Sequence, residues 1–119
     1  MPHIEARLIL PTEPSRGSHL QAVHYQVELV KLERLLVETF GGYTQTEGIG
    51  AWRAPQGSIV RERVRIYLFA YDRYDHDQSE AMERLPADVR KSFDQEAVYL
   101  SRTELKGQPV HLAPWEGNE

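Results

Sequence analysis

A short stretch of the chain carries side chains suited to recognising an anionic, planar group. Alternate positions hold three arginines followed by two aromatic residues: Arg61, Arg63, Arg65, Tyr67 and Phe69. Guanidinium groups bind phosphate or carboxylate bidentately, and aromatic rings stack on a base or on another ring. Trp52 lies shortly before them, where it is either a stacking platform or a packing anchor.

Two glycines, Gly48 and Gly50, precede Trp52 within the same segment. Glycine leaves the backbone accessible between longer side chains. We therefore predict ligand or partner binding at Gly48, Gly50, Trp52, Arg61, Arg63, Arg65, Tyr67 and Phe69. The alternative is a solvated face on which the arginine stems cover the aromatic rings.

The sequence contains no catalytic signature. An acidic cluster with one histidine has oxygen ligands of the kind that Mg²⁺ prefers: Asp72, Asp75, His76, Asp77 and Glu80. Its spacing matches no metal-binding loop, and Asp77 is explained as a helix cap. We predict no metal, no cofactor and no catalytic residue. If the protein is an enzyme, its candidate residues are Glu47, Glu62 and His76.

Composition narrows the class of protein. The chain has 119 residues, 40% of them hydrophobic, and no cysteine. Residues 1–104 are expected to form one domain, and residues 105–119 a polar tail. The N-terminal sequence lacks the pattern of a signal peptide, and no membrane-spanning apolar run occurs, so we expect a cytoplasmic protein. The net charge of -4 weakens attraction to a polyanion.

Hydrophobic periodicity predicts the first two elements. Apolar residues at every second position predict a strand over residues 3–10. Apolar residues at helical intervals predict a helix over residues 19–40. Ser18 and Gln21 have the spacing of a capping box at the start of this helix, and Gly41 supplies a left-handed cap at its end.

A β-hairpin is expected next, with strands over residues 43–53 and 58–71. The turn between them, residues 54–57, has proline and glycine where a type I turn needs them. This turn predicts that Arg53 pairs with Ser58, and a bulge would shift the register by one residue.

The two faces of the second hairpin strand differ in composition. We expect its aliphatic face to pack against the helices: Val60, Val64, Ile66 and Leu68. The opposite face, with the arginines and aromatic rings, is then expected to be open.

The last two elements complete the predicted fold. Asp77 and Glu80 have capping-box spacing, and Pro86 is expected to divide the second helix into two pieces. A final strand is expected over residues 97–103. The order β-α-β-β-α-β predicts an α+β, ferredoxin-like fold with a four-stranded antiparallel sheet and two helices on one face.

Several motifs between residues 20 and 103 are structural in type. They are Phe40-Gly41-Gly42-Tyr43-Thr44, Thr46-Glu47-Gly48, Gly50-Ala51-Trp52, Gly57, Val60 to Tyr67 and Gln95-Glu96-Ala97-Val98. In these motifs the chain resembles small proteins of unknown function found in phages, plasmids and bacterial genomes. The resemblance implies a ferredoxin-like fold and assigns no activity or site residue.

We expect a small, non-enzymatic binding or regulatory protein that acts through the open sheet face. The partner is either a second copy, giving a homodimer through the aromatic patch, or another protein. The resemblance suggests a mobile-element-encoded inhibitor of a host protein as the narrower hypothesis. Two alternatives remain: a single-stranded nucleic-acid-binding domain, and a small enzyme with its site at a subunit interface.

Overall fold

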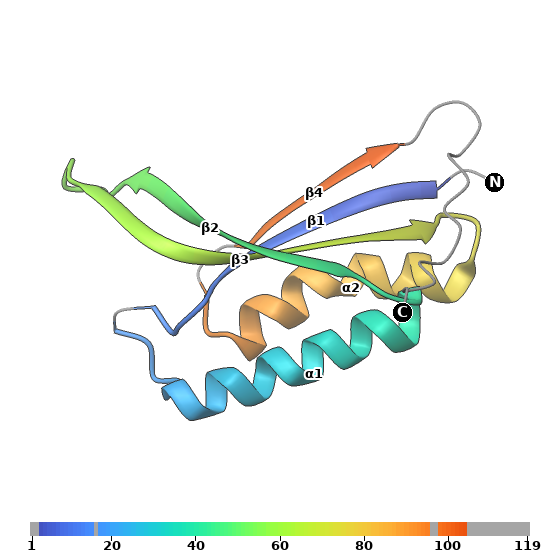
Figure 1. Cartoon of the computed structure of the whole chain (residues 1–119), viewed down its shortest axis with the longest axis horizontal. Coiled ribbons are helices and arrows are strands. Elements are labelled where there is room, and N and C mark those ends of the chain that lie inside the picture. The colour runs from blue at the N-terminus through green and yellow to red at the C-terminus, as the bar shows by residue number, and fades with distance from the viewer. Residues whose placement is uncertain (1–2, 16, 96–97, 105–119) are drawn as a thin grey trace, which may run out of the picture.

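The computed structural model describes residues 3–15, 17–95 and 98–104, and it has two layers. Both helices lie on the same side of one sheet (Figure 1). The elements are β1 (His3–Pro11), α1 (Ala22–Phe40), β2 (Thr44–Arg53), β3 (Ile59–Asp72), α2 (His76–Ser92) and β4 (Tyr99–Glu104). The four antiparallel strands have the order β2-β3-β1-β4. The predicted α+β, ferredoxin-like arrangement is confirmed.

The hydrophobic core fills the space between the sheet and the helices. Alternate residues of β1 are fully buried, which explains the period-two pattern of its sequence. Every third or fourth residue of α1 faces them. The core residues are Ala6, Leu8, Leu10, Tyr25, Leu29, Leu32, Leu36, Tyr67, Phe69, Tyr71, Met82, Leu85, Val89 and Phe93.

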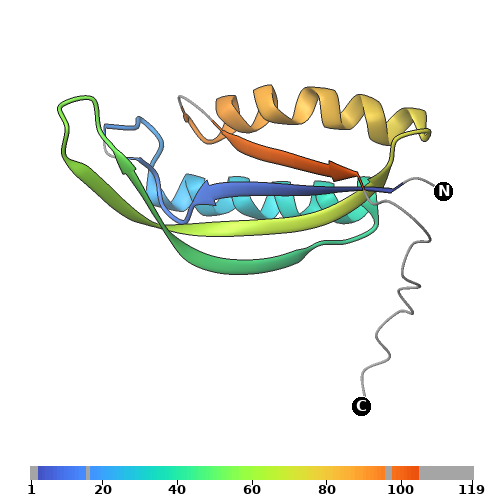
Figure 2. The same cartoon turned by 90° about the horizontal axis from the view of Figure 1, so that it is seen from above.

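The prediction of which face of β3 is open was wrong. Tyr67 and Phe69 are buried under the helices, and the Phe69 ring lies 4.9 Å from that of Phe40 in α1. Because side chains alternate along a strand, Arg61 and Arg63 belong to the same side. They stay exposed because β1 pairs with β3 only from position 64 onward, so the hairpin extends beyond the rest of the sheet (Figures 1 and 2).

The hairpin register also differs from the predicted one by one residue. Arg53 pairs with Ile59 instead of Ser58. Gly57 has a φ of 99°, its N–H donates to the carbonyl of Ala54, and the Ala54 N–H donates to the carbonyl of Ser58. This is a turn followed by a one-residue bulge with glycine in the left-handed conformation.

The start of α1 is another correction. The helix begins at Ala22, and Gln21 is its N-cap without a side-chain hydrogen bond. The Ser18 hydroxyl instead accepts a hydrogen bond from the N–H of Leu20, at 3.0 Å. At the other end, Gly41 has a φ of 91° and donates its N–H to the carbonyl of Val37, which confirms the predicted C-cap.

The second helix departs from expectation at two points. Its N-cap is Asp75, whose carboxylate accepts from the N–H of Gln78 at 3.1 Å, so Asp77 is not the cap. Pro86 lies inside a continuous helix that ends at Ser92. A proline there removes one backbone donor, yet the helix continues through it, with its neighbour Leu85 buried in the core.

The final strand starts at Tyr99, two residues later than predicted, and the expected tail at residues 105–119 lies outside the described residues. Within the described part of the chain, no helix has the length and apolar character needed to cross a membrane.

Candidate binding groove

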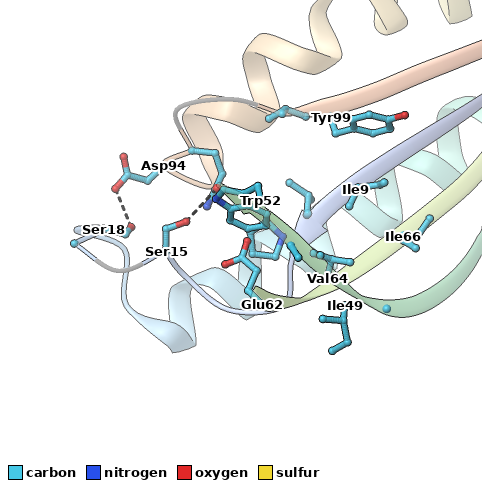
Figure 3. A pocket seen from close by; sticks show the side chains of 18 of the residues that line it. Ile9, Ser15, Ser18, Ile49, Trp52, Glu62, Val64, Ile66, Asp94 and Tyr99 are labelled. Carbon is cyan, nitrogen blue, oxygen red and sulfur yellow. Dashed lines mark hydrogen bonds between the residues drawn. The ribbon is translucent and has the colours of Figure 1, made fainter. Parts of the chain in front are cut away.

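A groove lies on the open face, the side of the sheet opposite the helices, near the end where the hairpin projects. It has a volume of about 1040 Å³ and is bounded by three segments of the chain. These are the β2–β3 hairpin, the loop between β1 and α1, and the loop between α2 and β4 (Figure 3). Residues far apart in the sequence therefore form one concave surface.

The floor of the groove is aliphatic. Ile9 of β1 pairs with Ile66 of β3, and Val64 lies two residues before Ile66 on the same face. Val64 is 7% exposed although no helix covers this side of the sheet. Neighbouring side chains of the open face therefore shield it from water.

Trp52 lies beside this floor, on the hairpin. A Cβ added at Gly50 would lie 3.3 Å from Cζ3 of the Trp52 ring and 3.2 Å from Cγ1 of Val64. The indole therefore lies over Gly50, in space that a side chain at position 50 would take. At Gly48 the nearest atoms to an added Cβ belong to Ile66 and Val64, at 3.7 and 3.9 Å.

Gly50→Ala is expected to displace the Trp52 ring, whereas Gly48→Ala is expected to fit. Overpacking at position 50 is expected to lower the free energy of unfolding by about 1 kcal/mol. Alanine at position 48 is expected to change it by a few tenths, in the stabilising direction, by restricting the unfolded chain. The chain has two tryptophans, so in the Trp115→Phe variant the tryptophan fluorescence comes from Trp52 alone. A shifted emission maximum in the Gly48 variant but not in the Gly50 variant would contradict this packing.

The two loops are joined by hydrogen bonds at one end of the groove. The Ser18 hydroxyl donates to Asp94 Oδ2 at 2.8 Å, and the His19 N–H donates to the same oxygen at 3.1 Å. The Ser15 hydroxyl donates to Gln95 Oε1 at 3.1 Å (Figure 3). The hydrogen bond from Ser18, followed by that from His19, lowers the pKa of the Asp94 carboxyl.

Glu62 supplies a second carboxylate from the hairpin side (Figure 3). Burial raises the pKa of this carboxyl, because partial loss of water disfavours the charged form. Tyr99, across the groove on β4, is 58% exposed and presents its ring to solvent. A ligand in the groove would therefore meet Trp52 from the hairpin, Tyr99 from β4 and a partly desolvated acid.

The structure separates the residues predicted to bind. Gly48, Gly50 and Trp52 line the groove, and the arginine-aromatic series does not. Arg65 donates to Glu33 Oε2 of α1 at 3.1 Å, and the Tyr67 hydroxyl donates to the same oxygen at 2.6 Å. These two side chains help to join the sheet to α1, and Phe69 is in the core.

Sequence reasoning missed most of the groove. Its loop residues, Ser18 and Asp94, are 76 positions apart and carry no local motif that links them. Ile9 offered one usable signal, because it is apolar at a position of the first strand that faces away from the core. Val64 and Ile66 had been assigned to the helix side.

The candidate residues for catalysis do not come together. Glu62 lies on the open face and not on the helix side as expected, and His76 begins α2. Glu47 pairs in register with Arg65, on the other face from Glu62. Among residues 3–15, 17–95 and 98–104, no group of three His, Asp or Glu side chains is placed to hold a metal ion.

The fold and the groove define a small α+β protein with a ferredoxin-like sheet and one concave site on its open face. The chain belongs to the family described as "Protein of unknown function (DUF3574)", whose sequence model matches residues 33–107. The resemblance to proteins of unknown function is thereby confirmed. No curated protein matches the chain.

A solved structure shares the fold. It is titled a phage SAM lyase in complex with S-methyl-5'-thioadenosine, and the two chains are 12% identical with a TM-score of 0.56. The match covers 92% of this chain and 93% of that one. At this level of identity, the likeness extends to the arrangement of strands and helices alone.

Proposed function

We propose that this protein is a small binding protein that takes its ligand in the groove on the open sheet face. The observation that supports it is one aromatic ring, Trp52, beside an aliphatic floor of Ile9, Val64 and Ile66. Binding sites for small molecules are concave and mostly apolar, with a few polar groups that orient the ligand. The carboxylate of Glu62 is such a group.

The charges of the groove favour a neutral or cationic ligand. Its acidic residues are Glu62 and Asp94, and within the described part of the chain no arginine or lysine lines it. An anion placed there would be repelled, whereas a hydroxyl or ammonium donor would offset the desolvation of Glu62. We therefore propose a neutral or cationic ligand in place of the anionic ligand that the arginine series suggested.

A nucleoside thioether is the first ligand to test. The solved phage protein of similar fold is titled as a complex with S-methyl-5'-thioadenosine. Such a molecule is uncharged, has a planar purine that can stack on Trp52, and has ribose hydroxyls that can donate to Glu62. Each of these properties complements a side chain of the groove.

The regulatory role expected from the sequence is retained in this proposal, in the reducing cytoplasm that a chain without cysteine favours. Inhibition of a host protein by a mobile-element product remains its narrower form.

Single-stranded nucleic acid fits the open face less well, since binding to phosphates depends on basic residues. By strand alternation, Arg7 is the only lysine or arginine on the open face among the described strand residues.

Titration with S-methyl-5'-thioadenosine is expected to give a saturable change in Trp52 fluorescence below about 1 mM. The measurement uses the Trp115→Phe variant, so that one tryptophan reports. Gly50→Ala is expected to weaken binding by about tenfold, equal to about 1.4 kcal/mol, because the ring that forms one side of the site moves. Gly48→Ala is the matched control: its added methyl group would contact the floor and not the Trp52 ring, so it should weaken binding less than Gly50→Ala does.

Two outcomes would count against the proposal. A flat titration up to about 10 mM, well beyond ordinary ligand affinities, would exclude the nucleoside thioether. Saturable binding that Gly50→Ala leaves unchanged would place the site outside the groove. A mixed single-stranded oligonucleotide in the same assay, at low salt, tests the nucleic-acid alternative.

A further inference from the structure

The outer surface of α1 carries an exposed stripe of valines. Its four members are 63%, 47%, 58% and 51% exposed: Val23, Val27, Val30 and Val37. The buried residues of the same helix are Tyr25, Leu29, Leu32 and Leu36. At 100° per residue the two sets lie on opposite sides of the helix, so the stripe faces away from the sheet.

The stripe brings no benefit to an isolated chain. Valine is a weak helix former, because its branched side chain loses rotamer freedom against the preceding turn. Single exposed apolar residues are ordinary on protein surfaces, but four of them on one side of a helix mark an interaction surface. Their spacing of three, four and seven residues is that of a helix-helix contact.

Three members of the stripe are symmetric about Val30, whereas the position that mirrors Val27 holds Glu33. Val23 and Val37 each lie seven residues from Val30. If a second copy of α1 packs antiparallel with a twofold axis at Val30, then Val30 meets its equivalent. Val23 then faces the partner subunit's Val37. A self-complementary surface of this kind is what a twofold dimer requires.

The polar residues beside the stripe suit the same arrangement. His24 and Glu38 lie on one flank, and in the antiparallel pairing His24 is two residues, about 3 Å along the axis, from the position that faces the partner subunit's Glu38. Its side chain can therefore reach that carboxylate, and the twofold axis repeats the contact. Lys31, near the axis, is already paired with Glu28 at 3.3 Å, which limits repulsion between the two lysines. Arg34 interrupts the stripe, where its aliphatic stem can cover the partner subunit's Val27 and its guanidinium can reach water.

We propose that the protein forms a homodimer through antiparallel packing of α1 on α1 of a second copy, centred on Val30. The dimer expected from the sequence used the aromatic residues of β3, and those residues are in the core. The helical interface leaves both grooves open. It therefore does not depend on the ligand proposed above.

Single cysteines test this geometry directly, because the natural chain has none. Under mild oxidation, Val30→Cys is expected to form a disulfide-linked dimer, since the two positions meet at the axis. Val23→Cys alone should not, because its two copies lie about 21 Å apart along the helix, beyond disulfide reach. A mixture of the Val23→Cys and Val37→Cys proteins should form the mixed dimer.

The mass in solution provides the second measurement. Light scattering of the unmodified chain is expected to give twice the monomer mass at about 100 µM, and Val30→Glu should give the monomer with an unchanged circular dichroism spectrum. A monomeric parent protein would overturn the proposal. So would a dimer that survives Val30→Glu, or cross-linking of Val23→Cys as efficient as that of Val30→Cys.

Discussion

Replacing Phe69 with alanine is expected to lower the free energy of unfolding by about 3–5 kcal/mol. Phe69 is 4% exposed, and its ring contacts that of Phe40, so the substitution leaves a cavity between β3 and α1. Both the lost transfer free energy and the cavity contribute to the cost. Denaturation by urea, followed by circular dichroism, measures the change.

The matched control is Ile59→Ala on the same strand. Ile59 is 60% exposed, so its truncation should cost less than about 1 kcal/mol. The comparison also tests the face assignment, because an open aromatic face would make Phe69 dispensable to the fold. Equal costs at the two positions would mean that Phe69 is not in the core. We expect Phe69→Ser to unfold the protein and not to yield a folded monomer.

The element order could be predicted because each element has a local signal. Alternating apolar residues mark β1, helical spacing marks α1, and the Pro-Gln-Gly sequence marks the hairpin turn. The helix starts were less predictable. Ser18 fits a capping box, yet its hydroxyl donates to Asp94, 76 positions away, and tertiary contacts of this kind leave no local trace.

The choice of the open face failed because both faces of β3 are apolar along much of its length. One face has Val64, Ile66 and Leu68, and the other has Tyr67 and the two aromatic residues that follow it at alternate positions. Arginines at one end of the second face suggested exposure. They are compatible with a core because the hairpin projects beyond β1, and because Arg65 meets Glu33.

The groove could be predicted only in part. Trp52 and the two glycines that precede it were among the residues predicted to bind, and they line the groove. Their partners across the hairpin were displaced by one position, because the bulge at Gly57 changes which residues share a face. The loop walls, such as Asp94, depend on the closure of the whole sheet.

The stability of the protein is expected to fall steeply above pH 10 because of two buried tyrosines. Burial raises the pKa of Tyr25 and of Tyr67. Both phenols also donate hydrogen bonds: Tyr25 to the carbonyl of Pro11, and Tyr67 to Glu33. In the unfolded chain they ionise near the ordinary value of 10.0, whereas in the folded protein they keep their protons.

The sign of the effect follows from proton linkage. Above pH 10 the folded state binds more protons than the unfolded state, so each further rise in pH favours unfolding. The stability conferred by the protonated phenols is complete below the unfolded pKa and is lost as pH rises toward the folded pKa. Each tyrosine contributes a slope on the order of 1 kcal/mol per pH unit in that window.

Urea denaturation between pH 8 and pH 12 measures this slope in matched variants. At pH 8 the free energy of unfolding of Tyr25→Phe and of Tyr67→Phe should each be about 1 kcal/mol lower than that of the parent, because the hydrogen bond of the phenol is lost. Each substitution should also flatten the decrease of stability at alkaline pH. Tyr74→Phe is the control, since Tyr74 is 71% exposed, and its slope should equal that of the parent. If all three variants kept the parent slope, ionisation of these two phenols would not drive alkaline unfolding. A flattened slope in the two buried variants alone would instead link alkaline stability to the contacts that join α1 to the sheet.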